Sequence, residues 1–137
     1  MGKSTKIFLA VSFFLLLFFL SYLILDHFYW VEIRDQKRKE DLTSIQKALS
    51  AYLTYNRSYP ETDILSFGRP WKSFDVSYMS KVPSDPKPIL GSPYCYNNFG
   101  NIYLLCAQME GDKNRSPNTC NVNGKDINYN YCVYDSY

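Results

Sequence analysis

Glycine and proline are missing from a long N-terminal stretch of this 137-residue chain. Residues 3–59 contain neither, and all seven prolines lie at Pro60 or beyond. Both residue types interrupt helices, so nothing within this stretch signals the end of one. The stretch therefore predicts an unusually long helix that ends near the Tyr59-Pro60 pair.

Charge is also scarce at the N-terminus, where Lys3 and Lys6 are the only charged residues before Asp26. Between Lys6 and Asp26, residues Ile7 to Leu25 form an uncharged apolar run of 19 residues. As a helix this run spans roughly 28 Å, close to the roughly 30 Å thickness of a bilayer core. A cleaved secretory signal is the alternative, but its apolar part is usually shorter, and no small-residue cleavage site follows here. We expect residues 1–25 to form a cytoplasmic tip and a membrane anchor.

The rest of the chain lacks an excess of positive charge. Residues 26–137 contain 13 basic and 13 acidic side chains in 112 positions. Domains that bind nucleic acid usually present a basic stripe to the phosphate backbone. We therefore expect no nucleic-acid partner, and a length of 112 residues indicates one modest domain.

Residue patterns typical of enzymes are missing as well. The single histidine, His27, borders the predicted anchor, and the chain contains no GxSxG, no glycine-rich phosphate loop and no HExxH. These are the motifs that most directly indicate nucleophilic, phosphate-binding or zinc chemistry. We expect no enzymatic activity and assign no catalytic residue.

Two different patterns follow the predicted anchor within the same helix. Residues 26–41 contain the segment RDQKRKED, which is polar on every helical face and predicts a solvated stalk. An apolar stripe then recurs at helical spacing and predicts the face that packs on a core. Its residues are Leu42, Ile45, Leu49 and Tyr52. We expect residues 42–137 to form the globular domain.

Strand-like alternation appears only in the C-terminal part. Residues 66–92 mix Gly, Pro, Ser and Asp and predict a loop-rich connector. Residues 94–96 and 103–109 alternate with period two around a turn-forming Asn-rich segment, which predicts an antiparallel hairpin, and residues 129–134 predict a third strand. The predicted fold class is α+β, with a long N-terminal helix, one half membrane-spanning and the other amphipathic, packed on a small antiparallel sheet.

The four cysteines occur at spacings that match no CxxC metal or redox motif. Two disulfides in an oxidising compartment are the favoured interpretation, with unpaired buried thiols as the alternative. Strand parity places Cys95, Cys106 and Cys132 on one sheet face. Short loops favour pairing Cys95 with Cys106 and Cys120 with Cys132, while a Cys106–Cys132 bond stays open.

The orientation of the anchor does not follow from the basic residues alone. Lys3 and Lys6 precede the apolar run, but four basic residues follow it closely: Arg34, Lys37, Arg38 and Lys39. The expected disulfides favour an extracytoplasmic domain. We therefore predict a single-pass protein of the cell membrane with a cytoplasmic N-terminus.

A polar loop over residues 111–126 offers oxygen ligands of the kind that calcium prefers. The candidate ligands are Asp112, Asn114 and Asp126, although Pro117 occupies the position where an EF-hand loop needs glycine. Ordinary turn chemistry explains the same composition. No other cofactor is expected.

Several segments, taken in order, resemble a known superfamily. They are Arg34-Asp35, the helix DLTSIQKALSAY from Asp41 to Tyr52, Asn56, Tyr59-Pro60, VPSDP from Val82 to Pro86, Tyr94-Cys95-Tyr96, and YLLCAQME from Tyr103 to Glu110. In this order and spacing the chain resembles the type IV pilin superfamily, especially the major pseudopilins of type II secretion and related bacterial pilin-like proteins. The resemblance covers residues 34–110.

The resemblance implies a structural role in a type IV pilus or a type II secretion-like machine, with pilin-like subunits, secretion-machine proteins and the lipid bilayer as partners. The N-terminus departs from the family pattern, in which cleavage follows a Gly and a glutamate lies a few residues later. Here Lys3 follows Gly2, and residues 5–8 contain no carboxylate. A membrane-tethered binding module that does not polymerise is therefore the alternative function.

Overall fold

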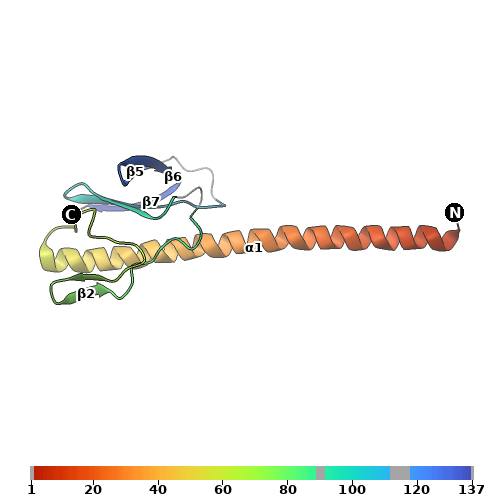
Figure 1. The fold of residues 1–137 in the computed structure, drawn as a ribbon, viewed down its shortest axis with the longest axis horizontal. Coiled ribbons are helices and arrows are strands. Elements are labelled where there is room, and N and C mark those ends of the chain that lie inside the picture. Colours follow the sequence, from red (N-terminus) through yellow and green to blue (C-terminus); the bar gives the residue numbers. More distant parts are fainter. Residues whose placement is uncertain (1, 89–91, 112–117, 137) are drawn as a thin grey trace. The chain divides into compact units, whose positions relative to one another are not determined.

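A computed structural model describes residues 2–88, 92–111 and 118–136 of the chain. The chain divides into two compact units, Met1–Ile33 and Arg34–Tyr137, and we call the second unit the head. One helix, α1 (Lys3–Asn56), contributes to both units (Figure 1). This confirms the long helix predicted from the missing glycine and proline.

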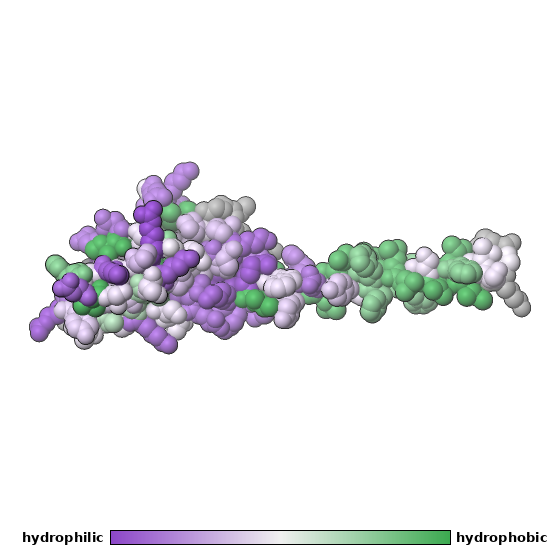
Figure 2. All heavy atoms as spheres, turned by 60° about the horizontal axis from the view of Figure 1, so that its bottom comes forward, coloured by the Kyte–Doolittle hydropathy of each residue, from purple (hydrophilic) through white to green (hydrophobic). Residues whose placement is uncertain are grey.

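The first unit consists of α1 residues whose apolar side chains are exposed on every side. Ile7 and Leu25, the predicted limits of the anchor, are 63% and 68% exposed. The large apolar side chains between them are exposed as well. Figure 2 shows the hydrophobic colour covering this part of the helix. A helix that is apolar all round needs an apolar surrounding, and this one is long and apolar enough to cross a membrane.

In the head, α1 presents the predicted apolar stripe to the core. Leu42, Ile45 and Leu49 are fully buried, and Tyr52 packs beside them. The helix ends after Asn56, because Arg57 adopts a left-handed φ of 57° and its N–H reaches Leu53 O at 2.7 Å. Such a residue commonly ends a helix.

Among the described residues of the head, seven short antiparallel strands form three small sheets. A three-stranded sheet has the order β3-β4-β7, and two hairpins, β1-β2 and β5-β6, form the others. In the view of Figure 1 the β1-β2 hairpin lies on the opposite side of α1 from the other sheets. The strands are β1 (Trp71–Ser73), β2 (Val76–Met79), β3 (Cys95–Asn98), β4 (Ile102–Ala107), β5 (Asn118–Val122), β6 (Lys125–Tyr129) and β7 (Tyr131–Ser136).

The three-stranded sheet buries both of its faces. On one face, tyrosines and small apolar side chains pack with the stripe of α1; these are Tyr94, Tyr96, Tyr103, Leu105 and Ala107. On the other face, Cys95 and Cys106 pack with Cys120 and Tyr129. The period-two alternation predicted for residues 94–96 and 103–109 is thus confirmed, and the fold is α+β with a long helix packed on an antiparallel sheet.

The connector prediction was wrong, and the third strand is confirmed with shifted bounds. The predicted loop-rich connector contains the β1-β2 hairpin, in which Trp71 stacks on Tyr52 of α1 with ring centroids 5.4 Å apart. The expected third strand begins two residues later than predicted, because Tyr129 ends β6 and β7 starts at Tyr131. The short strands of the β1-β2 hairpin have mixed polarity and produced no clear alternation, whereas the alternation over residues 129–134 did indicate the strand that pairs with β4.

Candidate functional site

A buried arginine on α1 joins the helix to two loops of the head. Arg38 is 0% exposed, and its guanidinium donates from Nε and Nη2 to the two carboxylate oxygens of Asp85, at 2.9 and 3.0 Å. Its Nη1 donates to Asp35 Oδ1 at 2.8 Å and to Glu110 Oε1 at 3.0 Å. A further bond from Nη2 reaches Lys87 O at 2.7 Å, so each of the five guanidinium N–H groups has an acceptor.

A second arginine and two backbone amides complete this ionic cluster, which we define as Arg34, Asp35, Arg38, Asp85 and Glu110. Arg34 forms a bidentate pair with Glu110, with both N···O distances 2.6 Å. Asp35 accepts from the N–H groups of Glu110 and Gly111, at 2.9 and 2.8 Å. The carboxylates therefore bind α1 to the loop that follows β4.

The cluster holds Glu110 and Arg38 in their charged forms. Hydrogen bonding from Arg34 is the largest effect on Glu110, and with the bond from Arg38 it outweighs burial and lowers the pKa of Glu110 to about 2. Burial lowers the pKa of Arg38, but the hydrogen bonds that its guanidinium donates to Asp85 and Glu110 outweigh it and raise that pKa overall. Arg38 therefore stays charged throughout the range in which proteins fold.

A neighbouring buried carboxylate continues the polar contacts along α1. Asp41 accepts from the Tyr94 hydroxyl at 2.9 Å and pairs with Lys37 at 2.8 Å. Burial, followed by the bond to Asp41, raises the pKa of Tyr94, which therefore stays neutral. Tyr94 thus fixes β3 to the helix by a hydrogen bond as well as by packing.

The predicted solvated stalk is wrong for residues 34–41. Asp35 and Arg38 are buried because amides and carboxylates of the loops satisfy their charges, and Asp41 is buried beside Lys37 and the Tyr94 hydroxyl. A signal in the sequence could have indicated this. Asp35 and Arg38 continue the stripe of Leu42, Ile45 and Leu49 at alternating spacings of three and four, so they share its face.

Chemically, the ionic cluster is a joint between elements and not a reactive centre. The carboxylates of Asp35, Asp85 and Glu110 are occupied by guanidinium or amide donors. No group of three or more His, Cys, Asp or Glu side chains suited to a metal ion occurs within the described ranges. The cluster therefore offers rigidity to the head.

All four cysteines form disulfides, but the favoured pairing was wrong. The bonds join Cys95 to Cys120 and Cys106 to Cys132. Cys106 lies opposite Cys95 on β3 and also opposite Cys132 on β7, so strand parity alone allowed both partners. The Cα atoms of Cys106 and Cys132 are 4.1 Å apart, as in the closely spaced pairs of antiparallel strands. Cys95 is then left to hold the β5-β6 hairpin over the sheet.

The predicted calcium ligands are not assembled by the described residues. Asp112 and Asn114 lie outside the residues that the structure describes. Asp126 lies in β6, where its carboxylate accepts from the Asn121 side chain at 2.7 Å. Calcium binding therefore stays an untested prediction.

A cleft of about 740 Å³ opens on the head beside β3. Three segments line it: the loop after α1 within residues 61–67, strand β3 with its approach within residues 93–98, and the β5-β6 turn at residues 121–124. The Cys95–Cys120 disulfide joins two of these walls. The volume is within the range of 300–1,000 Å³ that is common for ligand sites.

The walls of the cleft are polar and acidic. Glu61 and Asp63 are its two charged side chains, both exposed, and neither makes a side-chain ion pair or hydrogen bond with the described residues. Phe67, Tyr94 and Tyr96 add aromatic surface. The cleft is thus suited to an occupant that combines an apolar ring with a positive charge. Sequence reasoning did not indicate this cleft, because its walls are distant in the chain.

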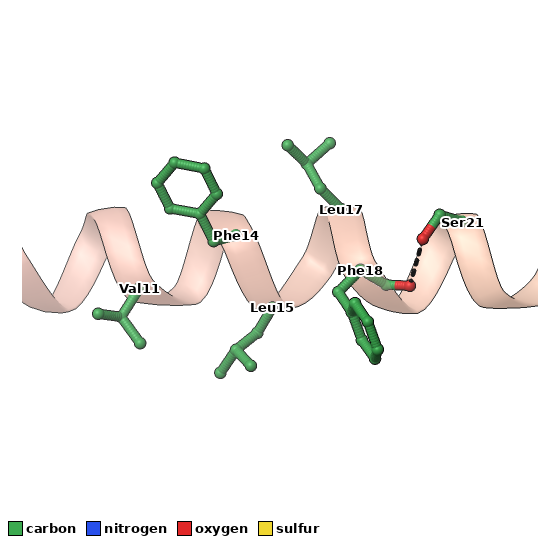
Figure 3. A pocket seen from close by; sticks show the side chains of 6 residues that line it. All are labelled: Val11, Phe14, Leu15, Leu17, Phe18 and Ser21. Carbon is green, nitrogen blue, oxygen red and sulfur yellow. Dashed lines mark hydrogen bonds between the residues drawn. The ribbon is translucent and has the colours of Figure 1, made fainter.

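The anchor has a surface of its own on one side of the helix. Figure 3 shows Val11, Leu15 and Phe18 along one edge, with Phe14 and Leu17 along the other. Ser21 donates to Phe18 O at 2.8 Å, which satisfies its hydroxyl within the helix. A hydroxyl bonded in this way is compatible with an apolar surrounding. This surface is a shallow apolar groove of the kind that lipid chains or another helix cover.

Comparison of the chain with protein-family models, curated proteins and solved structures gave no match.

Proposed function

We propose that this chain is a single-pass membrane protein that serves as a pilin-like or pseudopilin-like component, structural or accessory, of a type IV pilus or a type II secretion-like machine. We propose no enzymatic activity for this chain. Its N-terminus would lie in the cytoplasm and its head on the extracytoplasmic side of the cell membrane.

One observation supports the proposal most directly. The helix that includes the apolar anchor continues without a glycine or proline into the head, where Leu42, Ile45 and Leu49 form the centre of the core. A tethered domain usually follows its anchor through a flexible linker, which would be rich in Gly, Pro or Ser. Sharing one helix between anchor and core agrees with the resemblance to pilins.

The two disulfides support the extracytoplasmic side, because disulfides persist in oxidising compartments. Thiol labelling of intact cells tests this. An impermeant maleimide should label the full chain only after treatment with an impermeant reductant. Labelling that needs cell lysis, or free thiols without any reductant, would overturn the orientation.

Assembly is tested by shearing the surface of expressing cells in which the machine is built. We expect full-length chain in the sheared fraction, in filaments visible by electron microscopy. A chain found solely as dispersed membrane protein under those conditions would count against the subunit role. The N-terminal residue of the mature chain gives an independent test, because cleavage after Gly2 is the processing that pilins undergo.

A tethered binding module is the second candidate, and the cleft beside β3 is the observation that favours it. Its two carboxylates make no side-chain pair with the described residues and are free to meet a partner, as is the partly exposed ring of Phe67. The missing carboxylate in residues 5–8 agrees with this candidate, since the glutamate that registers pilin subunits has no counterpart there. Intact Met1 in the mature chain would favour it.

A further inference from the structure

The β1-β2 hairpin has a turn whose residues do not suit its geometry. Ser73 pairs with Val76, so Phe74 and Asp75 form a two-residue turn, and Phe74 has a φ of 50°. In the left-handed region a bulky residue costs roughly 1–2 kcal/mol. The β5-β6 hairpin has a turn of the same length, formed by Asn123 and Gly124, which adopt a positive φ at little cost.

Among the described residues of the head, Phe74 is also the most exposed large apolar side chain. Its side chain is 96% exposed, so neither packing nor turn geometry accounts for a phenylalanine at this position. Strained residues that folding does not require occur mainly at functional positions. Exposed aromatic side chains are the usual centres of protein interfaces. The hairpin tip with Phe74, which we call the knob, is therefore suited to filling a pocket on a partner.

The cleft beside β3 has the matching properties. It has room for a phenyl ring, its walls include Phe67 and Tyr96, and its two charges are negative. The hairpin strand that leads to Phe74 supplies a positive charge, Lys72, which is exposed and makes no ion pair with the described residues. The ring of Phe74 suits the aromatic wall at Phe67, and Lys72 suits the two carboxylates. Asp75, the other turn residue, adds a negative charge, so the match depends on Lys72 and not on the net charge of the tip.

We propose that the hairpin tip of one head, with Phe74 and Lys72, inserts into the cleft of a second copy, where Lys72 meets Glu61 and Asp63. This inference rests on the proposed assembly of subunits and specifies the contact between their heads. In the view of Figure 1 the hairpin lies on the opposite side of α1 from the sheets that line the cleft. Each head can then offer its knob to one neighbour and its cleft to another, which produces an open row.

The contact is weak by itself. A hairpin tip buries less surface than the roughly 1,200 Å² of the smallest stable interfaces. Anchoring in one membrane raises the effective concentration of heads and compensates for this. The test therefore uses the full chain in membranes.

The experiment replaces Phe74 with photo-reactive p-benzoylphenylalanine in the full-length membrane-bound chain. Illumination should give dimers and higher adducts, and mass spectrometry should locate the crosslink in residues 61–67, 93–98 or 121–124 of the second copy. The same replacement at Phe99, an exposed residue on the β3-β4 turn, is the matched control and should give few adducts. Adducts to lipid only, adducts elsewhere on the head, or equal yields from both positions would overturn the proposal.

Charge reversal supplies a second test in the same chain. Lys72→Glu should lower the adduct yield about two- to fivefold, as expected for one exposed ion pair, and Glu61→Lys with Asp63→Lys should restore it. A yield that ignores the charges, or no rescue, would contradict the contact of Lys72 with the cleft.

Folding and assembly are separated by a turn variant. Phe74→Asn with Asp75→Gly gives the hairpin a suitable turn, so the head should melt at a higher temperature. Higher-order adducts from a photo-reactive residue placed at Ser77, which is exposed opposite Lys72, should disappear. Adducts that persist in this variant would count against Phe74 as the knob. Adducts mapped to the cleft in a chain that is absent from the sheared fraction would keep the head contact and refute the pilus or secretion role. Filaments without such adducts would support the pilus or secretion role and refute the proposed contact between heads.

Discussion

Arg38 bonds α1 to two loops near the start of the head. It is fully buried and binds three carboxylates from three parts of the chain, Asp35, Asp85 and Glu110. Burying an ion pair gains little compared with apolar packing, but removing one partner leaves the others uncompensated. The cluster is therefore more important for the position of the loops on α1 than for net stability.

Arg38→Met should destabilise the head by about 3–5 kcal/mol, because buried carboxylates then face one another without their cation. Urea unfolding of the full chain in detergent, followed by tryptophan fluorescence, measures this. Arg69→Met is the control, since the Arg69 side chain is exposed, and it should change stability by less than about 0.5 kcal/mol. Equal effects of the two substitutions would show that Arg38 is not a buried joint.

Glu110 gives the head a defined response to acid. Its pKa is about 2 in the folded chain, below the ordinary value of 4.5, so its contribution to stability is present above pH 4.5 and is lost as pH falls toward 2. The urea midpoint should fall over this window. Glu110→Gln should lower stability at pH 6 and flatten the decline, whereas Glu61→Gln, at an exposed carboxylate, should leave the profile unchanged. If the urea midpoint of Glu110→Gln falls with pH in parallel with that of the wild type, Glu110 is not the source of the acid response.

At this scale the sequence predicts apolar contacts better than ionic ones. Leu42, Ile45 and Leu49 were predicted because apolar residues at helical spacing need a core. Arg38 lies on the same face, but a charge is normally solvated unless partners are supplied. Its partners Asp85 and Glu110 are 47 and 72 residues away, so local pattern contains no trace of them.

Among the elements, the β5-β6 hairpin depends on a covalent bond. The Cys95–Cys120 disulfide attaches it to β3, whereas Cys106–Cys132 joins β4 and β7, which already pair along their length. Their sequence separations are 25 and 26 residues, so a chain-entropy argument gives each bond a similar value of about 3 kcal/mol. The two bonds should differ in what their loss releases.

Replacing Cys95 and Cys120 by serine should free the hairpin while the three-stranded sheet persists. Amide hydrogen exchange should rise selectively over residues 118–129. The matched control replaces Cys106 and Cys132 by serine, which should lower global stability similarly without that local increase. A non-reducing digest should yield the Cys95–Cys120 and Cys106–Cys132 peptides, and a Cys95–Cys106 peptide would contradict the pairing.

Elements were predictable where their pattern is long. The helix from Lys3 to Asn56 follows from the missing glycine and proline, and the β3-β4 hairpin follows from period-two alternation around a turn-forming segment. The β1-β2 hairpin was missed because its turn is Phe74-Asp75 and not the Asn-Gly or Asp-Gly pair that signals a hairpin. Disulfide pairing failed for a related reason, since Cys106 is central and faces a cysteine on both sides.

At the scale of the whole molecule, the two units differ in the surrounding that each requires. The head buries a core of its own and is covered by polar residues, whereas the first unit exposes apolar side chains from Ile7 to Leu25 (Figure 2). Tyr29 and Trp30 follow the apolar run, and such residues are enriched where a membrane meets water. The apolar surface of the first unit therefore suits a bilayer, and the polar surface of the head suits water.

Replacing Leu16 and Leu17 by arginine tests this difference between the units. Each arginine at the middle of a span costs about 2.5–3.5 kcal/mol in insertion, and the apolar gain of two leucines is lost as well. The variant should leave the carbonate-resistant membrane fraction, whereas Leu16→Ile with Leu17→Ile should stay in it. Since the contacts of the ionic cluster and both disulfides lie within the second unit, the arginine variant, oxidised in vitro, should keep the wild-type urea midpoint. A head that unfolds when the anchor is disrupted would show that the units are not independent, and a variant that remains membrane-inserted would refute the anchor.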